Sequence, residues 1–387
     1  MTASRIPSVE GGIQPTLLTA KGDLLTASAT STVTNLPVGA DGQTLVANSA
    51  SASGLQWQAP SAPLQNPILN SAFQVWQRGT SIAVAAATVP YTADRWQIQT
   101  GASVASTVSR QATADTTNLP NIQYCARVQR NSGQTGTAGI AFAQNFESIN
   151  SIPFSGKTVT FSFYARAGAN YSAASNALAV YVISGTGTDQ NVFVGGITGQ
   201  SNFIASSATL TTTWQRFTFT GTVSATATQL IADLIYTPVG TAGTNDYYEI
   251  TGVQLEVGSV ATPFHTFSTT IQGELAACQR YYWRQTAPEG TTPFGSGAAY
   301  ASTGMGATIK LPVTMRTKPS SIDFSALAVS DIANAGINIT TVAFASSENG
   351  LDSFILNITG GTGMTQYRYY NLVAQSTASY LGFSAEL

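Results

Sequence analysis

Short runs of alternating apolar and polar residues dominate the chain from residue 66 onward. In residues 159–165 every second side chain is apolar, and residues 214–219 and 250–257 show similar alternation. Gly, Asn and Ser, which favour tight turns, separate these runs. Strands at this spacing over residues 66–265 predict a β-sandwich, and a jelly roll is the topology that fits best.

The first 65 residues follow a different pattern. Residues 1–20 are polar and interrupted by Pro and Gly, which indicates an extended tether that becomes ordered on a partner. In residues 21–65 the strand candidates 23–27, 43–47 and 55–58 alternate with turns, and a Pro-rich linker follows. Because so short a segment cannot bury a sufficient core, we expect it to form a β-shaft against copies of itself.

One helical pattern interrupts the strands. Over residues 271–284, Ile271, Leu275, Cys278 and Tyr282 form an apolar stripe, which predicts a short helix within a connector at 266–285. Strand patterns then return at 307–313, 337–345, 353–358, 366–373 and 379–385. Residues 286–387 are therefore predicted to form a second, smaller β-sandwich, and the fold class of the whole chain is all-β.

Composition excludes several classes of partner. Asp, Glu, Lys and Arg make up 9% of the chain, against roughly 25% in ordinary domains, and the net charge is −2 with no basic block. Nucleic-acid binding and membrane insertion are therefore not expected. The N-terminus lacks the apolar core of a signal peptide, so a protein acting outside cells is expected to leave by another route, of which release of virions by lysis is one. Cys125 and Cys278 are predicted to be buried free thiols.

The acidic residues do not predict a catalytic site. Hydrolysis of a glycosidic bond usually needs two facing carboxylates, and the acids here are sparse. Asp94 is interpreted as part of a surface pair with Arg95 beside a packing Trp96, while Asp246 and Glu249 are placed in a solvated turn. No catalytic residue and no enzyme activity are therefore predicted, although folding can bring distant carboxylates together.

Metal and cofactor chemistry is equally unsupported by the sequence. The sole histidine, His265, is interpreted as a linker residue, so a Ser-His-Asp triad and a His-rich metal site are not expected within one chain. No cofactor is predicted. A structural calcium ion near the start of the sandwich is compatible with the sequence, but no ligand is assigned.

Several motifs together resemble a family of bacteriophage tail fibres and tail spikes. Residues 21–25 (KGDLL), 36–43 (LPVGADGQ) and 55–57 (LQW) are similar to a module of fibre shafts. Residues 66–79 with 94–96 (DRW) resemble the opening of a carbohydrate-binding-module-like sandwich, and 252–264 with 274–282 resemble its closing strand and the helix that follows. Residues 311–316 and 380–387 look like the C-terminal domain of the family.

The resemblance implies a homotrimer whose N-terminus docks to a phage tail or baseplate protein and whose C-terminal domain, residues 286–387, points outward. Such a protein would be a virion component, assembled in the host cytoplasm and acting extracellularly. The function expected from it is attachment to a host-surface glycan. Two alternatives stay open, an architectural adaptor that connects the tail to another receptor-binding protein and a polysaccharide-degrading spike.

Candidate receptor contacts come from aromatic residues, because rings stack on sugar faces. Alternation places Tyr367 and Tyr369 on one face of a strand and Arg368 with Tyr370 on the other. One face is predicted to be core or trimer interface. The other, with Arg368 and Tyr370, is taken as the candidate receptor surface, and Tyr300 after a Gly- and Ala-rich loop is added to it.

Overall fold

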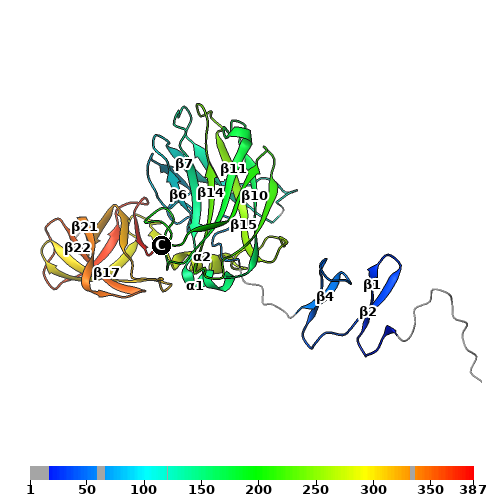
Figure 1. Cartoon of the computed structure of the whole chain (residues 1–387). Coiled ribbons are helices and arrows are strands. Elements are labelled where there is room, and N and C mark those ends of the chain that lie inside the picture. Colours follow the sequence, from blue (N-terminus) through cyan, green and yellow to red (C-terminus); the bar gives the residue numbers. More distant parts are fainter. Residues whose placement is uncertain (1–16, 59–65, 120, 332–335) are drawn as a thin grey trace, which may run out of the picture. The chain divides into compact units, whose positions relative to one another are not determined.

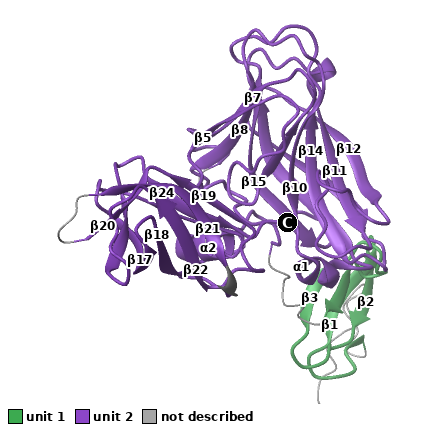
Figure 2. Cartoon of the chain, turned by 90° about the vertical axis from the view of Figure 1, so that its left-hand side faces the viewer, with its two compact units in different colours: residues 1–63 green, residues 64–387 purple. Residues whose placement is uncertain are grey.

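The structure, a computed structural model, describes residues 17–58, 66–119, 121–331 and 336–387, apart from the side chains of residues 346–348. Strands account for nearly all regular structure in this part of the chain, which confirms the all-β prediction (Figure 1). The chain forms two compact units, residues 1–63 and 64–387 (Figure 2). The predicted tether lies almost wholly outside the described residues.

The first unit contains two small antiparallel hairpins. One pairs β1 (Leu24–Ala29) with β2 (Thr32–Leu36), and the other pairs β3 (Thr44–Ala47) with β4 (Leu55–Gln58). Three of these strands overlap the predicted ones, and β2 was not predicted. No side chain of residues 17–58 is buried in the single chain.

The shaft motif corresponds to two local arrangements in this unit. The Asp23 carboxylate accepts hydrogen bonds from the backbone N–H groups of Thr19 (2.9 Å) and Val38 (3.0 Å), which hold the pKa of Asp23 well below its usual value. The Trp57 ring lies against Gly39, where an added Cβ would come within 2.7 Å of the indole. The motif residues thus fix the turns between strands.

Two antiparallel sheets form the sandwich of the second unit (Figure 1). The six-stranded sheet has the order β13 (Gln215–Thr222), β10 (Thr158–Ala167), β15 (Tyr247–Val257), β8 (Tyr124–Arg130), β7 (Ser106–Ala112) and β5 (Ser81–Val84). The five-stranded sheet has the order β12 (Ser201–Thr209), β11 (Ala177–Gly185), β14 (Gln229–Tyr236), β9 (Ile140–Asn145) and β6 (Gln97–Thr100). Short helical turns α1 (Ser148–Ser151), η2 (Ile152–Phe154) and η3 (Ala174–Asn176) connect strands.

The core of the sandwich follows the predicted alternation. Phe161 and Phe163 of β10 are fully buried, and Trp96 stacks on Phe142 with ring centroids 4.9 Å apart. Both cysteines are buried and free, as predicted. The two inner faces therefore form one continuous apolar core, which leaves the outer faces of both sheets for polar contacts.

The predicted helix is shorter than its apolar stripe. Helix α2 covers Ile271–Gln279 and begins at Thr270, whose hydroxyl accepts a hydrogen bond from the N–H of Gly273. The chain then enters β16 (Tyr282–Thr286), which pairs with β24 (Tyr380–Ser384) near the C-terminus. The helix ends because the chain pairs with a strand about 100 residues away. A local sequence pattern does not reveal such a contact.

The C-terminal part is a barrel, so the prediction of a second sandwich is wrong. The strands β17 (Pro293–Ala301), β18 (Gly304–Lys310), β22 (Ser353–Gly360), β21 (Ile337–Asn349), β20 (Leu327–Ser330) and β23 (Tyr369–Ala374) close on themselves. β16, β24 and β19 (Ser321–Ser325) form a separate three-stranded sheet. Closure occurs because β17 pairs with both β18 and β23, which leaves no free edge in the barrel. Among the described residues, no helix has the length and apolarity needed to cross a membrane.

Candidate functional site

Three exposed tyrosines come together where β17 meets β23 on the outside of the barrel. Tyr367 is 83% exposed, Tyr369 63% and Tyr300 46%. Tyr369 is directly opposite Ala298 in the strand pairing, and the N–H of Tyr367 donates to the carbonyl of Ala299, next to Tyr300. Strand pairing therefore gathers three aromatic rings on one stretch of surface, which we call the tyrosine face.

Neighbouring groups hold these rings in place. The Tyr369 hydroxyl lies 2.8 Å from the Ser296 hydroxyl, within hydrogen-bond distance. The Tyr300 ring lies against Gly304, where an added Cβ would come within 2.5 Å of the ring carbons. A side chain at residue 304 would displace this ring, so the glycine leaves the space that the Tyr300 ring occupies.

Tyr367 has a backbone conformation that normally belongs to glycine. Its φ is +66°, in the left-handed region, and it begins a β-bulge, because the single residue Ala299 bonds to both Tyr367 and Arg368. Bulges of this kind usually have glycine at that position. An exposed tyrosine held at such a conformational cost is typical of a residue kept for contact with a ligand.

Replacing Tyr367 with glycine separates this cost from any role in binding. We expect Tyr367→Gly to raise the free energy of unfolding by about 0.5 kcal/mol, since relief of the left-handed strain slightly exceeds the entropy cost of glycine. Tyr369→Gly, in the extended strand, should instead lower it by about 1 kcal/mol. Urea unfolding measures both, and equal losses in the two variants would contradict the strain at Tyr367.

The structure contradicts one of the predicted contact residues, Tyr370, and leaves Arg368 at the surface. Tyr370 is 1% exposed, and its hydroxyl accepts a hydrogen bond from the N–H of Thr365 (2.8 Å), so it belongs to the barrel core. Arg368 is half exposed and forms an ion pair with Asp331 (2.7 Å). Alternation holds from Tyr369 onward in β23, but the bulge interrupts it before that, so Tyr367, Arg368 and Tyr369 are all exposed and only Tyr370 is buried. Only closure of the barrel decides which face points outward.

The carboxylates considered for hydrolysis are buried and paired with arginines. Asp246 is fully buried and accepts hydrogen bonds from the N–H of Ser172 (3.0 Å) and from Arg130 (3.3 Å). Glu249 is also fully buried and pairs with Arg127 and Arg166, each at 2.6 Å. Their placement in a solvated turn is therefore wrong, because folding brings arginines from other strands to them.

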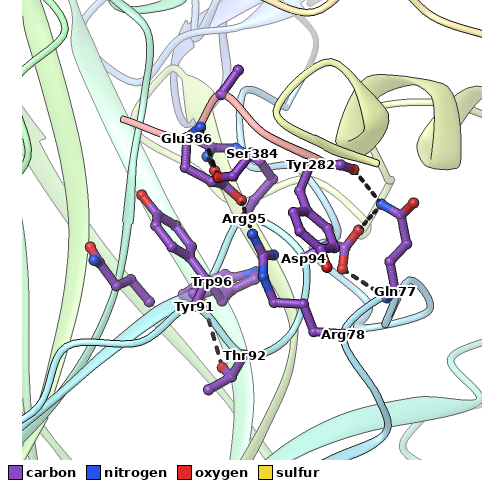
Figure 3. Close-up of polar contacts among 12 residues, drawn as sticks. Gln77, Arg78, Tyr91, Thr92, Asp94, Arg95, Trp96, Tyr282, Ser384 and Glu386 are labelled. Atoms are coloured by element: carbon purple, nitrogen blue, oxygen red, sulfur yellow. Dashed lines mark hydrogen bonds and ion pairs between the residues drawn. The ribbon is translucent and has the colours of Figure 1, made fainter. Parts of the chain in front are cut away.

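Asp94 and Arg95 are buried as well, so their interpretation as a surface pair is wrong. Asp94 accepts a hydrogen bond from the N–H of Gln77 (2.9 Å), and burial raises the pKa of Asp94 above its ordinary value. Arg95 pairs instead with Glu386, nearly 300 residues away (Figure 3). Trp96 is buried, as predicted. In the described part of the chain, His, Cys, Asp and Glu form no group of three that could hold a metal ion.

A buried polar joint connects the sandwich to the C-terminal segment (Figure 3). The Glu386 carboxylate accepts from both Arg95 and Arg78, the latter at 3.3 Å. Arg95 also donates to the carbonyl of Asn145 (2.7 Å), and its guanidinium lies 3.5 Å from the centre of the Tyr281 ring. Burial works to lower the pKa of Arg95, but the charge of Glu386 outweighs it and the pKa lies above its usual value.

The motifs that resemble the phage family meet in this joint. Arg316 donates to the carbonyls of Ala385 (2.8 Å) and Glu386 (3.0 Å), while its own N–H donates to the carbonyl of Arg280 (2.8 Å). The N–H of Ala385 donates to the carbonyl of Tyr281 (2.7 Å). Residues from four separate motifs thus build one contact, which fixes how the barrel attaches to the sandwich.

Comparisons with known proteins add limited information. No family model matches the chain, and no curated protein does. Among solved structures, the enzymatically active domain of Bacteriophage CBA120 tailspike protein 4 aligns with 50% of this chain at 12% identity and a TM-score of 0.31, and only 21% of that chain is covered. The CBM22-1-CBM22-2 tandem of Paenibacillus barcinonensis Xyn10C covers 85% of this chain and 100% of its own, at 11% identity and a TM-score of 0.27. TmCBM61, solved with β-1,4-galactotriose, aligns with 50% of this chain over 99% of its own length, at 11% identity and a TM-score of 0.29. Similarity at this level assigns no function to this chain.

Proposed function

We propose that this chain is a homotrimeric phage tail fibre protein that attaches the virion to a host-surface glycan through the tyrosine face of its barrel. The observation that carries the proposal is the clustering of Tyr300, Tyr367 and Tyr369, all exposed, at one strand pair. Aromatic rings stack on the apolar faces of sugars. The Ser296 hydroxyl and the exposed amide of Asn371, directly opposite each other on the same strands, can bond sugar hydroxyls.

The first unit supports the trimeric part of the proposal. Its four described strands pair as two two-stranded hairpins, and a two-stranded hairpin is at best marginally stable in water. Leu24, Val33 and Val38 are 37–49% exposed in the single chain. Copies of the same segment would cover these side chains, and three tyrosine faces presented together would convert weak contacts into avidity of roughly 10² or more. A monomer in native light scattering would contradict the trimer.

The engaged carboxylates support adhesion without hydrolysis. Asp246 and Glu249 are fully buried and paired with arginines, so neither offers a free acid to a substrate. A polysaccharide-degrading spike would instead release reducing ends from capsule or lipopolysaccharide during incubation with the protein. We expect no such release.

Adsorption competition tests the proposed function. Purified protein added to host cells before phage should block adsorption, and the variant Tyr367→Ala/Tyr369→Ala should need at least tenfold more protein for the same block, because both stacking rings are lost. Leu351→Ala, which removes another exposed apolar side chain from the same part of the chain, serves as the control and should block like wild type.

Two results would contradict this assignment. If folded, trimeric wild-type protein does not block adsorption, the architectural adaptor replaces the attachment function. If the double tyrosine variant blocks as well as wild type, the chain binds the receptor through another surface.

A further inference from the structure

An ion pair lies beside the tyrosine face of the barrel. Arg368 stands between Tyr367 and Tyr369 in the chain, and its Nε atom lies 2.7 Å from a carboxylate oxygen of Asp331. Asp331 directly follows β20, which pairs with β23 on the side opposite β17. The Arg368 side chain is 44% exposed and that of Asp331 is 6% exposed. The guanidinium is therefore half in solvent, but the protein itself balances its charge.

The strands that carry this face add no charge of their own. β17, β20 and β23, which are described over their whole length, contain no Asp, Glu, Lys or Arg. The polar side chains that they add include Ser296, Asn371 and Ser330, which form one row because Asn371 is directly opposite both serines. The face thus combines aromatic rings, uncharged polar groups and one balanced ion pair.

This combination discriminates between classes of saccharide. A sugar hydroxyl both donates and accepts hydrogen bonds, so it suits the hydroxyl and amide groups of the row. A carboxylate on a sugar would seek the cation, but the charge of Arg368 is already matched by Asp331. An anionic sugar would also have to approach the Asp331 carboxylate, and like charges placed close together reduce affinity. Uncharged sugars are therefore favoured.

We propose that the tyrosine face selects uncharged saccharides and that Asp331 determines this choice by neutralising Arg368. The inference rests on the proposed function, because it names the ligand class of the same face. With Asp331 in place, the guanidinium donates to the hydroxyls of a neutral sugar. Without it, the guanidinium becomes an uncompensated cation beside the aromatic rings, and it can bind a carboxylate or a sulfate through two parallel hydrogen bonds.

Matched pairs of immobilised oligosaccharides test this selection. The two members of a pair differ only at C6, which is a hydroxymethyl group in one and a carboxylate in the other. Wild-type protein should bind at least one uncharged member at least tenfold more tightly than its uronate counterpart. That affinity should change less than about twofold between about 20 and 500 mM NaCl, because no net charge is screened.

Asp331→Asn should reverse part of this selection. We expect the variant to bind the uronate member at least tenfold more tightly than wild type at about 20 mM NaCl, and this gain should disappear at about 500 mM. Water can hydrate the half-exposed guanidinium, so the variant should remain folded, which circular dichroism checks. Arg368→Gln/Asp331→Asn is the matched control. It removes both charges and should regain the wild-type preference for uncharged sugars.

The outcomes separate this inference from the proposed function. If wild type prefers uronates and Tyr367→Ala/Tyr369→Ala loses them, the face still binds glycans and only the selection of uncharged sugars is overturned. Unchanged selectivity and salt dependence in Asp331→Asn would overturn the role of Asp331 in the same way. If wild type binds no glycan, or if the double tyrosine variant binds like wild type, the proposed function and this inference both fall.

Discussion

Asp233→Asn should stabilise the free protein at pH 8 by about 2–4 kcal/mol, and the gain should disappear below about pH 4. The pKa of Asp233 is about 7 in the folded chain and near 3.8 in the unfolded chain, because burial disfavours the charge. The unfolded state therefore loses its proton first as the pH rises. Stability should fall by roughly 1.4 kcal/mol per pH unit between these two values in the wild type, and this slope should be absent in the variant.

Urea unfolding followed by tryptophan fluorescence across pH 4 to 8 measures this effect. Glu249→Gln is the matched control, since it removes a buried charge that has partners, and it should lower stability by about 2 kcal/mol at pH 8. Parallel pH profiles for wild type and Asp233→Asn would contradict an uncompensated carboxylate.

Glu386→Ala should detach the C-terminal part of the second unit from the sandwich. The substitution leaves Arg95, which is 2% exposed, without a carboxylate, and breaking a buried pair of this kind costs about 3–5 kcal/mol. We expect wild-type residues 64–387 to unfold in one transition and the variant in two, and we expect faster proteolysis between residues 259 and 270. Differential scanning calorimetry and limited proteolysis measure these changes.

Asp352→Ala provides the control for this prediction. Asp352 pairs with Lys310 at 3.7 Å, but both side chains are exposed, so the loss should be below about 0.5 kcal/mol. If Glu386→Ala unfolds like wild type, the joint does not couple the two parts. In that case the attachment of the barrel depends on the backbone pairing of β16 with β24.

Each strand range predicted from local patterns overlaps a strand of the structure, but these are eleven of the 24 described strands. Alternation in residues 159–165 identified β10 and the burial of Phe161 and Phe163, because side chains on a strand alternate between two faces whatever the partner strand is. The motif residues Gly39 and Trp57 also marked a real contact, since the β3–β4 hairpin between them brings the Trp57 ring back to Gly39. Such features depend on neighbours within about 20 residues.

The candidate site was predicted only in part. The alternation of Tyr367 and Tyr369 against Tyr370 is visible in the sequence, but the outward face depends on closure of the barrel, which places Tyr370 in the core. The positive φ of Tyr367 depends on its bond to Ala299 in another strand. No sequence pattern singled out Asp233, because a lone acidic residue in an apolar run does not reveal which residues will face it.

The sequence by itself determined the all-β class, the position of about half of the strands and the alternation of side chains between the two faces of those strands, because these follow from local backbone geometry and side-chain type. Tertiary structure alone decided that the C-terminal strands close into a barrel, that Arg95 meets Glu386, and that Glu249 pairs with two arginines while no described arginine forms an ion pair with Asp233. These outcomes depend on pairing between residues tens to hundreds of positions apart. Hydrophobic periodicity specifies which face is buried but carries no information about the partner that buries it.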